Sequence, residues 1–148
     1  MRVEVQTKRK QVTRTDGTTV NIVPKRGHLL VCASGCCCGL EKKNNPPVPV
    51  DRYQLEWEER KLRNLVHLTF SGCLGPCPLA NVALLLFDGH PFWFHSVNNE
   101  EVVVAIYDYI EALLQEGPNA TMPPILAERA FNNYAWPPPD PQSPIPDA

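Results

Sequence analysis

Alternation of apolar and polar residues predicts that the chain begins with β-structure. Residues 2–7 and 11–15 alternate in this way and lead to Asp16-Gly17, and the alternation resumes over residues 18–23. An Asp-Gly pair between two such stretches favours a tight hairpin, because both central residues of a type I′ turn adopt positive φ. The pattern ends shortly afterwards, and we therefore predict an N-terminal β-hairpin extension over residues 1–27.

Four later stretches have the length and composition of short strands. They are residues 28–33, 66–71, 82–87 and 91–97. The third is almost wholly apolar, as expected for a strand that is buried on both faces. Asp88-Gly89 separates the third from the fourth and predicts a second hairpin.

Two segments between and after these strands have helical signals. One begins near Asp51, whose carboxylate and Gln54 three residues later form a capping-box pattern. In the other, Asn98 is expected to cap the helix with Glu101 at the third position, apolar residues recur at i, i+3, i+4 and i+7, and Gly117-Pro118 ends the helix. The order strand, helix, strand, strand, strand, helix predicts an α/β (α+β) domain over residues 28–117, in which helices cover a sheet.

Composition changes near the C-terminus. Nine of the 16 prolines of this 148-residue chain lie between Pro118 and Pro146, so we expect residues 118–148 to form a proline-rich C-terminal extension. Within it, residues 125–136 are expected to form one short helix. Its apolar residues would either pack back on the body or bind a partner.

Charge and hydropathy exclude some classes of function. The formal net charge of −2 supplies no basic face, so we expect no nucleic-acid partner. No stretch approaches the ~20 apolar residues of a membrane-spanning helix, and the residues after Met1 do not open a signal peptide. We therefore expect a cytoplasmic protein without a membrane span, whose thiols stay reduced.

All six cysteines lie in two clusters, each directly after a predicted strand. Cys32 and Cys36-Cys37-Cys38 follow the first strand, and Cys73 and Cys77 follow the second. Loops that leave two strand ends can meet above a sheet and present four sulfurs to one point. In a chain without a secretory signal, grouped thiolates are more often metal ligands than disulfide partners.

Four cysteine thiolates, two to each iron, are the usual ligands of a [2Fe–2S] cluster. Cys73 and Cys77 supply one pair across a tight turn. The other pair comes from the first cluster, where adjacent side chains on an extended segment point to opposite faces, so three consecutive cysteines cannot all face one centre. We predict Cys32 with Cys37 as the first choice and Cys32 with Cys38 as the second.

Over about residues 28–115 the chain resembles the thioredoxin-like [2Fe–2S] ferredoxins. The resemblance rests on four features, namely Val31-Cys32, the segment from Gly72 to Cys77, the hairpin 82–97 and the closing helix. In that family four residues can separate the first ligand pair, as in Cys32 and Cys37, or a longer insertion can end in Cys-Gly, as at Cys38-Gly39. The second pair is Cys-x3-Cys, which Cys73 and Cys77 match.

This resemblance implies one-electron transfer through a [2Fe–2S] cofactor rather than enzymatic turnover of an organic substrate. The protein would be a soluble ferredoxin or a relay subunit of an oxidoreductase complex, with redox proteins as donor and acceptor, and a homodimer is plausible. Backbone amides that donate to the sulfurs favour the reduced cluster. Ser34-Gly35 and Leu74-Gly75 are the candidates for these amides.

Two other functions use the same cysteines. A structural zinc site would take four thiolates at tetrahedral geometry and make the protein an interaction module, although its usual Cys-x2-Cys spacing is absent. A thiol–disulfide redox protein is the second alternative, since Cys73 and Cys77 are close to a Cys-x2-Cys motif. That motif owes its low thiol pKa to a helix start, whereas Pro78 and an apolar stretch follow here.

Overall fold

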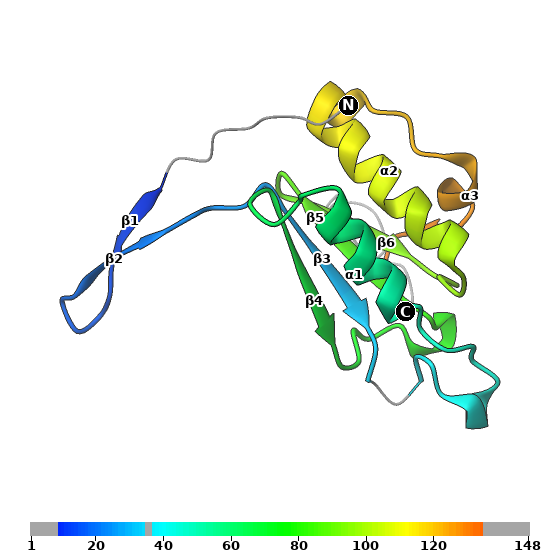
Figure 1. Ribbon diagram of the computed structural model, residues 1–148. Helices are drawn as coiled ribbons and strands as arrows, with labels where there is room; N and C mark the ends of the chain where they lie inside the picture. The colour runs from blue at the N-terminus through cyan, green and yellow to red at the C-terminus, as the bar shows by residue number, and fades with distance from the viewer. Residues whose placement is uncertain (1–8, 35–36, 135–148) are drawn as a thin grey trace, which may run out of the picture.

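The computed structural model describes residues 9–34 and 37–134. These residues form a five-stranded mixed sheet in the order β4-β3-β5-β6-β7 and a separate two-stranded hairpin (Figure 1). The strands of the main sheet are β3 Gly27–Cys32, β4 Val66–Ser71, β5 Ala83–Phe87, β6 His90–Phe94 and β7 Ala130–Phe131. The helices are α1 Val50–Glu59, α2 Glu100–Glu116 and α3 Pro124–Ala127.

The sheet combines one parallel pair with antiparallel neighbours. β3 pairs in parallel with β4, α1 lies in the connection between them, and β5 pairs antiparallel with β3 and β6. This arrangement confirms the predicted α/β (α+β) class and the predicted order of strand, helix, strand, strand, strand, helix.

Both long helices pack on one face of the sheet. Leu29 and Val31 of β3 and Leu85 of β5 lie in the same buried cluster as Tyr53 of α1 and Ile106 of α2. The Tyr107 hydroxyl donates to the Tyr53 carbonyl at 2.7 Å, which joins the two helices. The alternate strand residues face the other side, where a smaller cluster contains Cys32, Cys38, Val82, Leu84 and Trp93.

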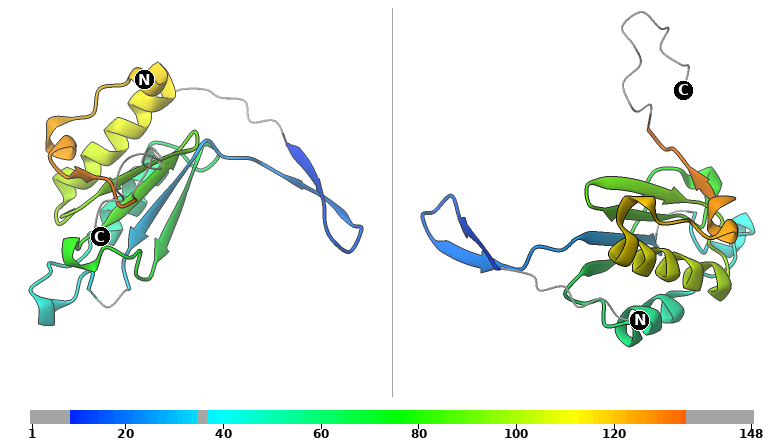
Figure 2. Two further views of the ribbon diagram at one scale, coloured as in Figure 1. Left: turned by 180° about the vertical axis from the view of Figure 1, so that it is seen from behind. Right: turned by 90° about the horizontal axis from the view of Figure 1, so that it is seen from above.

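The N-terminal hairpin is present as predicted, but its turn is not type I′, because only Gly17 of the Asp16-Gly17 pair has a positive φ. β1 Lys10–Thr13 pairs antiparallel with β2 Thr19–Ile22 across the Asp16-Gly17 turn. Figures 1 and 2 show it extending away from the sheet and its helices. The predicted strand over residues 2–7 lies outside the described residues. The strand pairing of the hairpin begins at Lys10.

The structure corrects both predicted helix starts. α1 begins at Val50 after Pro49, and no side chain caps it, so Asp51 lies inside the first turn rather than before it. Asn99, not Asn98, caps α2 by accepting the Val102 amide at 3.1 Å. The end of α2 at Gly117, where φ is +75°, agrees with the prediction.

The segment after α2 differs from the single helix expected over residues 125–136. Its described part forms the one-turn helix α3, which buries Leu126, and then β7, which pairs with β6. An edge strand has unpaired backbone groups, and β7 covers that edge of β6 opposite Trp93 and Phe94. Strand pairing therefore replaces the rest of the predicted helix, and Trp136 lies outside the described residues.

Two smaller outcomes concern β5 and the membrane. Four of the five residues of β5 are buried, but Leu86 is 39% exposed, so burial on both faces is incomplete.

Within the described ranges, none of the helices has the length and apolar content needed to cross a bilayer.

We predict that Gly27→Ala destabilises the fold by about 1–3 kcal/mol, because an added methyl group overpacks a filled site. A Cβ at Gly27 would lie 2.8 Å from the Phe87 ring and 3.0 Å from the Leu86 carbonyl oxygen. Urea unfolding followed by circular dichroism measures the change. Gly72→Ala is the matched control, because a Cβ there meets no atom within 4 Å; equal stability of the two variants would contradict the packing argument.

Candidate functional site

The two cysteine loops leave the sheet at the same edge. β3 and β4 run in parallel with Cys32 opposite Ser71, so the chain enters both loops from neighbouring positions. The Ala33 and Ser34 amides both donate to the Ser71 carbonyl, at 2.9 and 3.2 Å, and extend this pairing just beyond the strands. Cys73 follows two residues after Ser71 and therefore lies near the first loop.

All five described cysteines line one small cavity of about 10 Å³, roughly the room of one water molecule. Its remaining walls come from the second loop and the start of β5, namely Leu74, Gly75, Pro76 and Val82. Among the residues that the structure describes, no three cysteine, histidine or acidic side chains already form a complete metal-ligand set. The sulfurs are gathered in one place but must separate to admit more than a single ion.

Cys73 and Cys77 form one sulfur pair. Their Sγ atoms are 3.1 Å apart, whereas two thiolates on one tetrahedral metal with bonds of about 2.3 Å stand about 3.8 Å apart. Cys73 is exposed and Cys77 is half-buried, at the first residue of a short 3₁₀ turn over Cys77–Leu79. A small opening of this loop would bring both sulfurs to ligand spacing.

Cys32 and Cys38 form a second, buried pair. The exposed fractions of these residues are 3% and 6%, and the side chain of Cys38 hydrogen-bonds with that of Cys32. Burial raises the pKa of the Cys38 thiol to about 12, and the hydrogen bond with Cys32 adds to this shift. Binding of a metal at this pair must therefore displace a firmly held proton.

Cys37 has a different environment, although it also lines the cavity. Lys43 Nζ donates to the Cys37 sulfur at 3.3 Å. The Cys37 carbonyl accepts from Asn45 Nδ2 at 2.6 Å, so the turn that contains Cys37 is held by its own loop. Lys43 was not predicted from the sequence, because its approach depends on a 3₁₀ turn over Glu41–Lys43. Cys36 lies outside the described residues.

The amides expected to donate to sulfur are distributed unevenly. The Gly75 amide donates to Cys73 Sγ at 3.4 Å, as the sequence suggested for Leu74-Gly75. The Ser34 amide instead donates to the Ser71 carbonyl, so the expectation for Ser34 was wrong. Gly35 lies outside the described residues, so the expectation for its amide stays a prediction. The backbone at Gly75 has a φ of +118°, a conformation that glycine adopts readily and residues with a Cβ rarely adopt.

Asn81 holds the two loops together, a role that sequence reasoning missed. Its side chain is buried at 1% exposure, and its Oδ1 accepts the Gly39 amide at 2.7 Å. Its Nδ2 donates to the Pro46 carbonyl at 2.9 Å, and its own carbonyl accepts the Val97 amide at 3.0 Å. One asparagine thereby connects the loop that follows Cys38 with the segment that follows Cys77.

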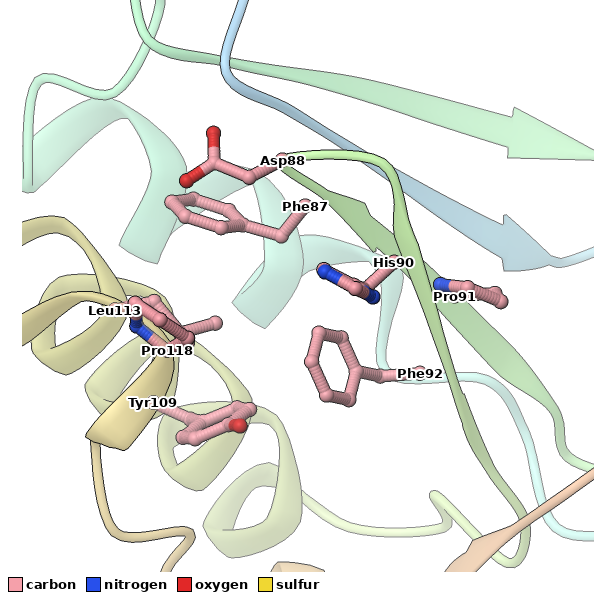
Figure 3. Close-up of a pocket in the computed structure, with 8 residues that line it drawn as sticks. All are labelled: Phe87, Asp88, His90, Pro91, Phe92, Tyr109, Leu113 and Pro118. Atoms are coloured by element: carbon pink, nitrogen blue, oxygen red, sulfur yellow. The ribbon is translucent and has the colours of Figure 1, made fainter.

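A second cavity, of about 400 Å³, lies near the turn between β5 and β6, and its wall includes α2. Figure 3 shows aromatic rings around it, with Phe87 and Phe92 from the strands and Tyr109 from the helix. The His90 side chain also lines this cavity. The cavity contains no cysteine, so it is separate from the sulfur site.

Grouped thiolates are soft ligands that select zinc, copper(I) or iron–sulfur clusters over hard cations. Two pairs of sulfurs, from two loops at one sheet edge, suit either a tetrahedral ion or two irons with two thiolates each. The donor set therefore fits a metal centre of this kind.

Comparison with known proteins finds no matching family model and no matching curated protein. The fold is similar to that of the wild-type thioredoxin-like [2Fe-2S] ferredoxin from Aquifex aeolicus, at 15% identity and a TM-score of 0.46, over 74% of this chain and 99% of that one. A cysteine-to-serine variant of that ferredoxin aligns at 16% identity and a TM-score of 0.47, over 72% and 98% of the two chains. A third structure, also of a thioredoxin-like [2Fe-2S] ferredoxin from Aquifex aeolicus, aligns at 18% identity and a TM-score of 0.46, over 74% of this chain and 93% of that one. These structures represent the same family that the sequence resembles.

Proposed function

We propose that this chain is an electron-transfer protein that holds one [2Fe–2S] cluster on four cysteine thiolates. The observation that carries the proposal is the convergence of five cysteines, from two loops far apart in sequence, on one cavity. When bound, such a cluster accepts and releases single electrons. The chain would act as a soluble ferredoxin or as the relay subunit of an oxidoreductase complex, with redox proteins as donor and acceptor.

The ligand set that the contacts favour is Cys32, Cys38, Cys73 and Cys77. Cys32 and Cys38 already hydrogen-bond through their side chains, and Cys73 and Cys77 already stand 3.1 Å apart, so each pair can serve one metal. Cys37, the first choice from sequence spacing, instead has the Lys43 ammonium at its sulfur. We therefore infer that Cys38 is the ligand and that Cys37 lies beside the centre.

The surrounding groups would tune the charge of such a centre. The Gly75 amide donates to the Cys73 sulfur, and the Lys43 ammonium lies beside the neighbouring Cys37 sulfur. Both place positive charge next to thiolates and so favour the more negative, reduced state. The burial of Cys32 and Cys38 works in the opposite sense, because a low dielectric disfavours added charge.

Exposure indicates where electrons would enter and leave. Cys73 is exposed, whereas Cys32 and Cys38 are buried beneath the loops. A redox partner would therefore approach the Cys73 side of the site. The reduced thiols that the site needs are maintained in the cytoplasm, which is the compartment we infer.

A structural zinc site is the alternative with a specific observation in its favour. The cavity of about 10 Å³ admits one ion with less rearrangement than a cluster of two irons and two sulfides requires. Zinc would use the same four thiolates and contribute to folding rather than to electron transfer. A thiol–disulfide function is favoured only by the close sulfurs of Cys73 and Cys77.

The first prediction concerns the metal itself. Anaerobic purification should give two irons and two labile sulfides per chain, visible absorption, and an electron paramagnetic resonance signal that appears on dithionite reduction. One zinc per chain without colour would contradict electron transfer and support the structural alternative. Catalysis of insulin reduction by metal-free protein would instead support the thiol–disulfide alternative.

The second prediction separates the consecutive cysteines. Cys38→Ser, Cys73→Ser and Cys77→Ser should each abolish the cluster or change its absorption spectrum strongly, because each removes a ligand. Cys37→Ser should retain the cluster and serves as the matched control. Loss of the cluster in Cys37→Ser, with its retention in Cys38→Ser, would assign the ligand pair to Cys32 and Cys37 instead.

The third prediction tests how the loops are held. Asn81→Ala should lower the free energy of unfolding by about 1–3 kcal/mol, because the Gly39 amide and the Pro46 carbonyl lose their buried partner. Bleaching by an iron chelator should also become several-fold faster than in the wild type. Gln54→Ala, at an exposed position of α1, is the control. Wild-type bleaching in Asn81→Ala would show that the loops do not depend on this side chain.

A further inference from the structure

The cavity of about 400 Å³ between the β5–β6 turn and α2 has no part in the proposed electron transfer. Val82, directly before β5, lines the sulfur site, whereas Phe87, the last residue of β5, lines this cavity. The five residues of β5 span about 17 Å, so the two sites lie at opposite ends of the strand. We call this second site the aromatic cavity.

The aromatic cavity has a buried floor and an open mouth. Phe87, Tyr109 and Leu113 form the floor, and their exposed fractions are 2%, 4% and 3%. His90 and Pro118 also line the cavity, but both residues are exposed. A small molecule can therefore enter from solvent and bury its apolar surface against the floor.

The volume and shape of the aromatic cavity suit a flat ring. A cavity of about 150 Å³ is enough for benzene, and binding sites for small molecules commonly measure about 300–1,000 Å³. The Phe92 and Tyr109 rings are nearly perpendicular, at 89° with their centroids 5.6 Å apart, and form one corner of the wall. Figure 3 shows the Phe87 ring on another side. A bound ring can therefore make face and edge contacts with aromatic walls.

The charges around the cavity favour a neutral ligand. Asp88 is the acidic residue of the wall, but its carboxylate accepts from Arg26 Nε at 3.2 Å and from Arg26 Nη2 at 2.7 Å. The Arg26 guanidinium also lies over the Phe87 ring, 5.1 Å from its centroid. None of the described residues that line the cavity is a lysine or an arginine. A cation would thus find the carboxylate already paired, and an anion would find no basic side chain in the wall.

The Tyr109 hydroxyl supplies a hydrogen-bond donor at the floor. α2 contributes Tyr109 and Leu113 to the wall, so this hydroxyl is the polar side-chain group on the helix side. Figure 3 shows the hydroxyl end of the ring on the side of Phe92. Burial raises the pKa of Tyr109, so the hydroxyl keeps its proton at neutral pH. It can therefore donate to an oxygen of a bound molecule.

We propose that the aromatic cavity binds a small neutral molecule that has an aromatic ring and a carbonyl-type acceptor oxygen. The ring lies against Phe87 and Phe92, and the oxygen accepts a hydrogen bond from the Tyr109 hydroxyl. The ring supplies affinity through burial, and the hydrogen bond selects ligands with an acceptor in the right place.

The test is a titration of the full-length protein with two probes of the same shape. Acetophenone has a ring and a carbonyl oxygen, and ethylbenzene has the ring without the acceptor. Nuclear magnetic resonance of the Phe87 and Phe92 ring protons should show saturable shifts with both. Tyr109→Phe should weaken the binding of acetophenone about two- to tenfold, because it removes one hydrogen bond, and leave that of ethylbenzene unchanged. Tyr134→Phe is the matched control at an exposed tyrosine outside the cavity, and should change neither.

A second variant tests the location by filling the cavity. Leu113→Phe adds volume at the floor and should abolish the shifts with both probes. Because added volume can also strain the core, circular dichroism and thermal unfolding are its controls. Tyr109→Phe keeps the ring in place and tests the site independently of this variant.

Other results would overturn the proposal. A wild type whose ring protons do not shift with either probe has no such site. Equal weakening of both probes by Tyr109→Phe would exclude the hydrogen bond. Phenyltrimethylammonium, a cation of similar size, should bind more weakly than acetophenone, and tighter binding would assign the cavity to cations instead. Metal-free and metal-loaded protein should give the same constants, so this proposal can fail while the cluster proposal stands, and the reverse.

Discussion

The parallel pairing of β3 with β4 is the constraint on which the cysteine site depends. Parallel strands need a long crossover, here residues 33–65, which contains α1. The Trp57 indole N–H donates to the Val66 carbonyl at 2.8 Å and attaches this crossover to the first residue of β4. Since both strands then run in the same direction, with Cys32 opposite Ser71, their carboxyl ends meet at one edge. The two cysteine clusters come together because of this geometry and not because of their distance in sequence.

The sequence was sufficient to predict those helices and strands that depend on patterns of neighbouring residues. An Asp-Gly pair between two strand-like stretches predicted both hairpins, and the apolar stripe before Gly117 predicted α2 through to its end. The errors fall where tertiary contacts decide. Asn98 was expected to cap α2, but its side chain accepts the Asn81 amide and leaves the cap to Asn99. The helix expected in the C-terminal segment gave way to β7 because β6 had an open edge.

The site was predictable as a gathering of cysteines but not as pairs of sulfurs. Strand-end position placed Cys32, Cys37, Cys38, Cys73 and Cys77 together, and all five line one cavity. The choice between Cys37 and Cys38 depends on the path of the loop between β3 and α1. That path is held by Asn81, which binds Gly39 and Pro46 from a segment more than thirty residues away in sequence. No local sequence pattern predicts this role, because a buried asparagine can be identified only from the hydrogen-bond partners that surround it in the folded protein.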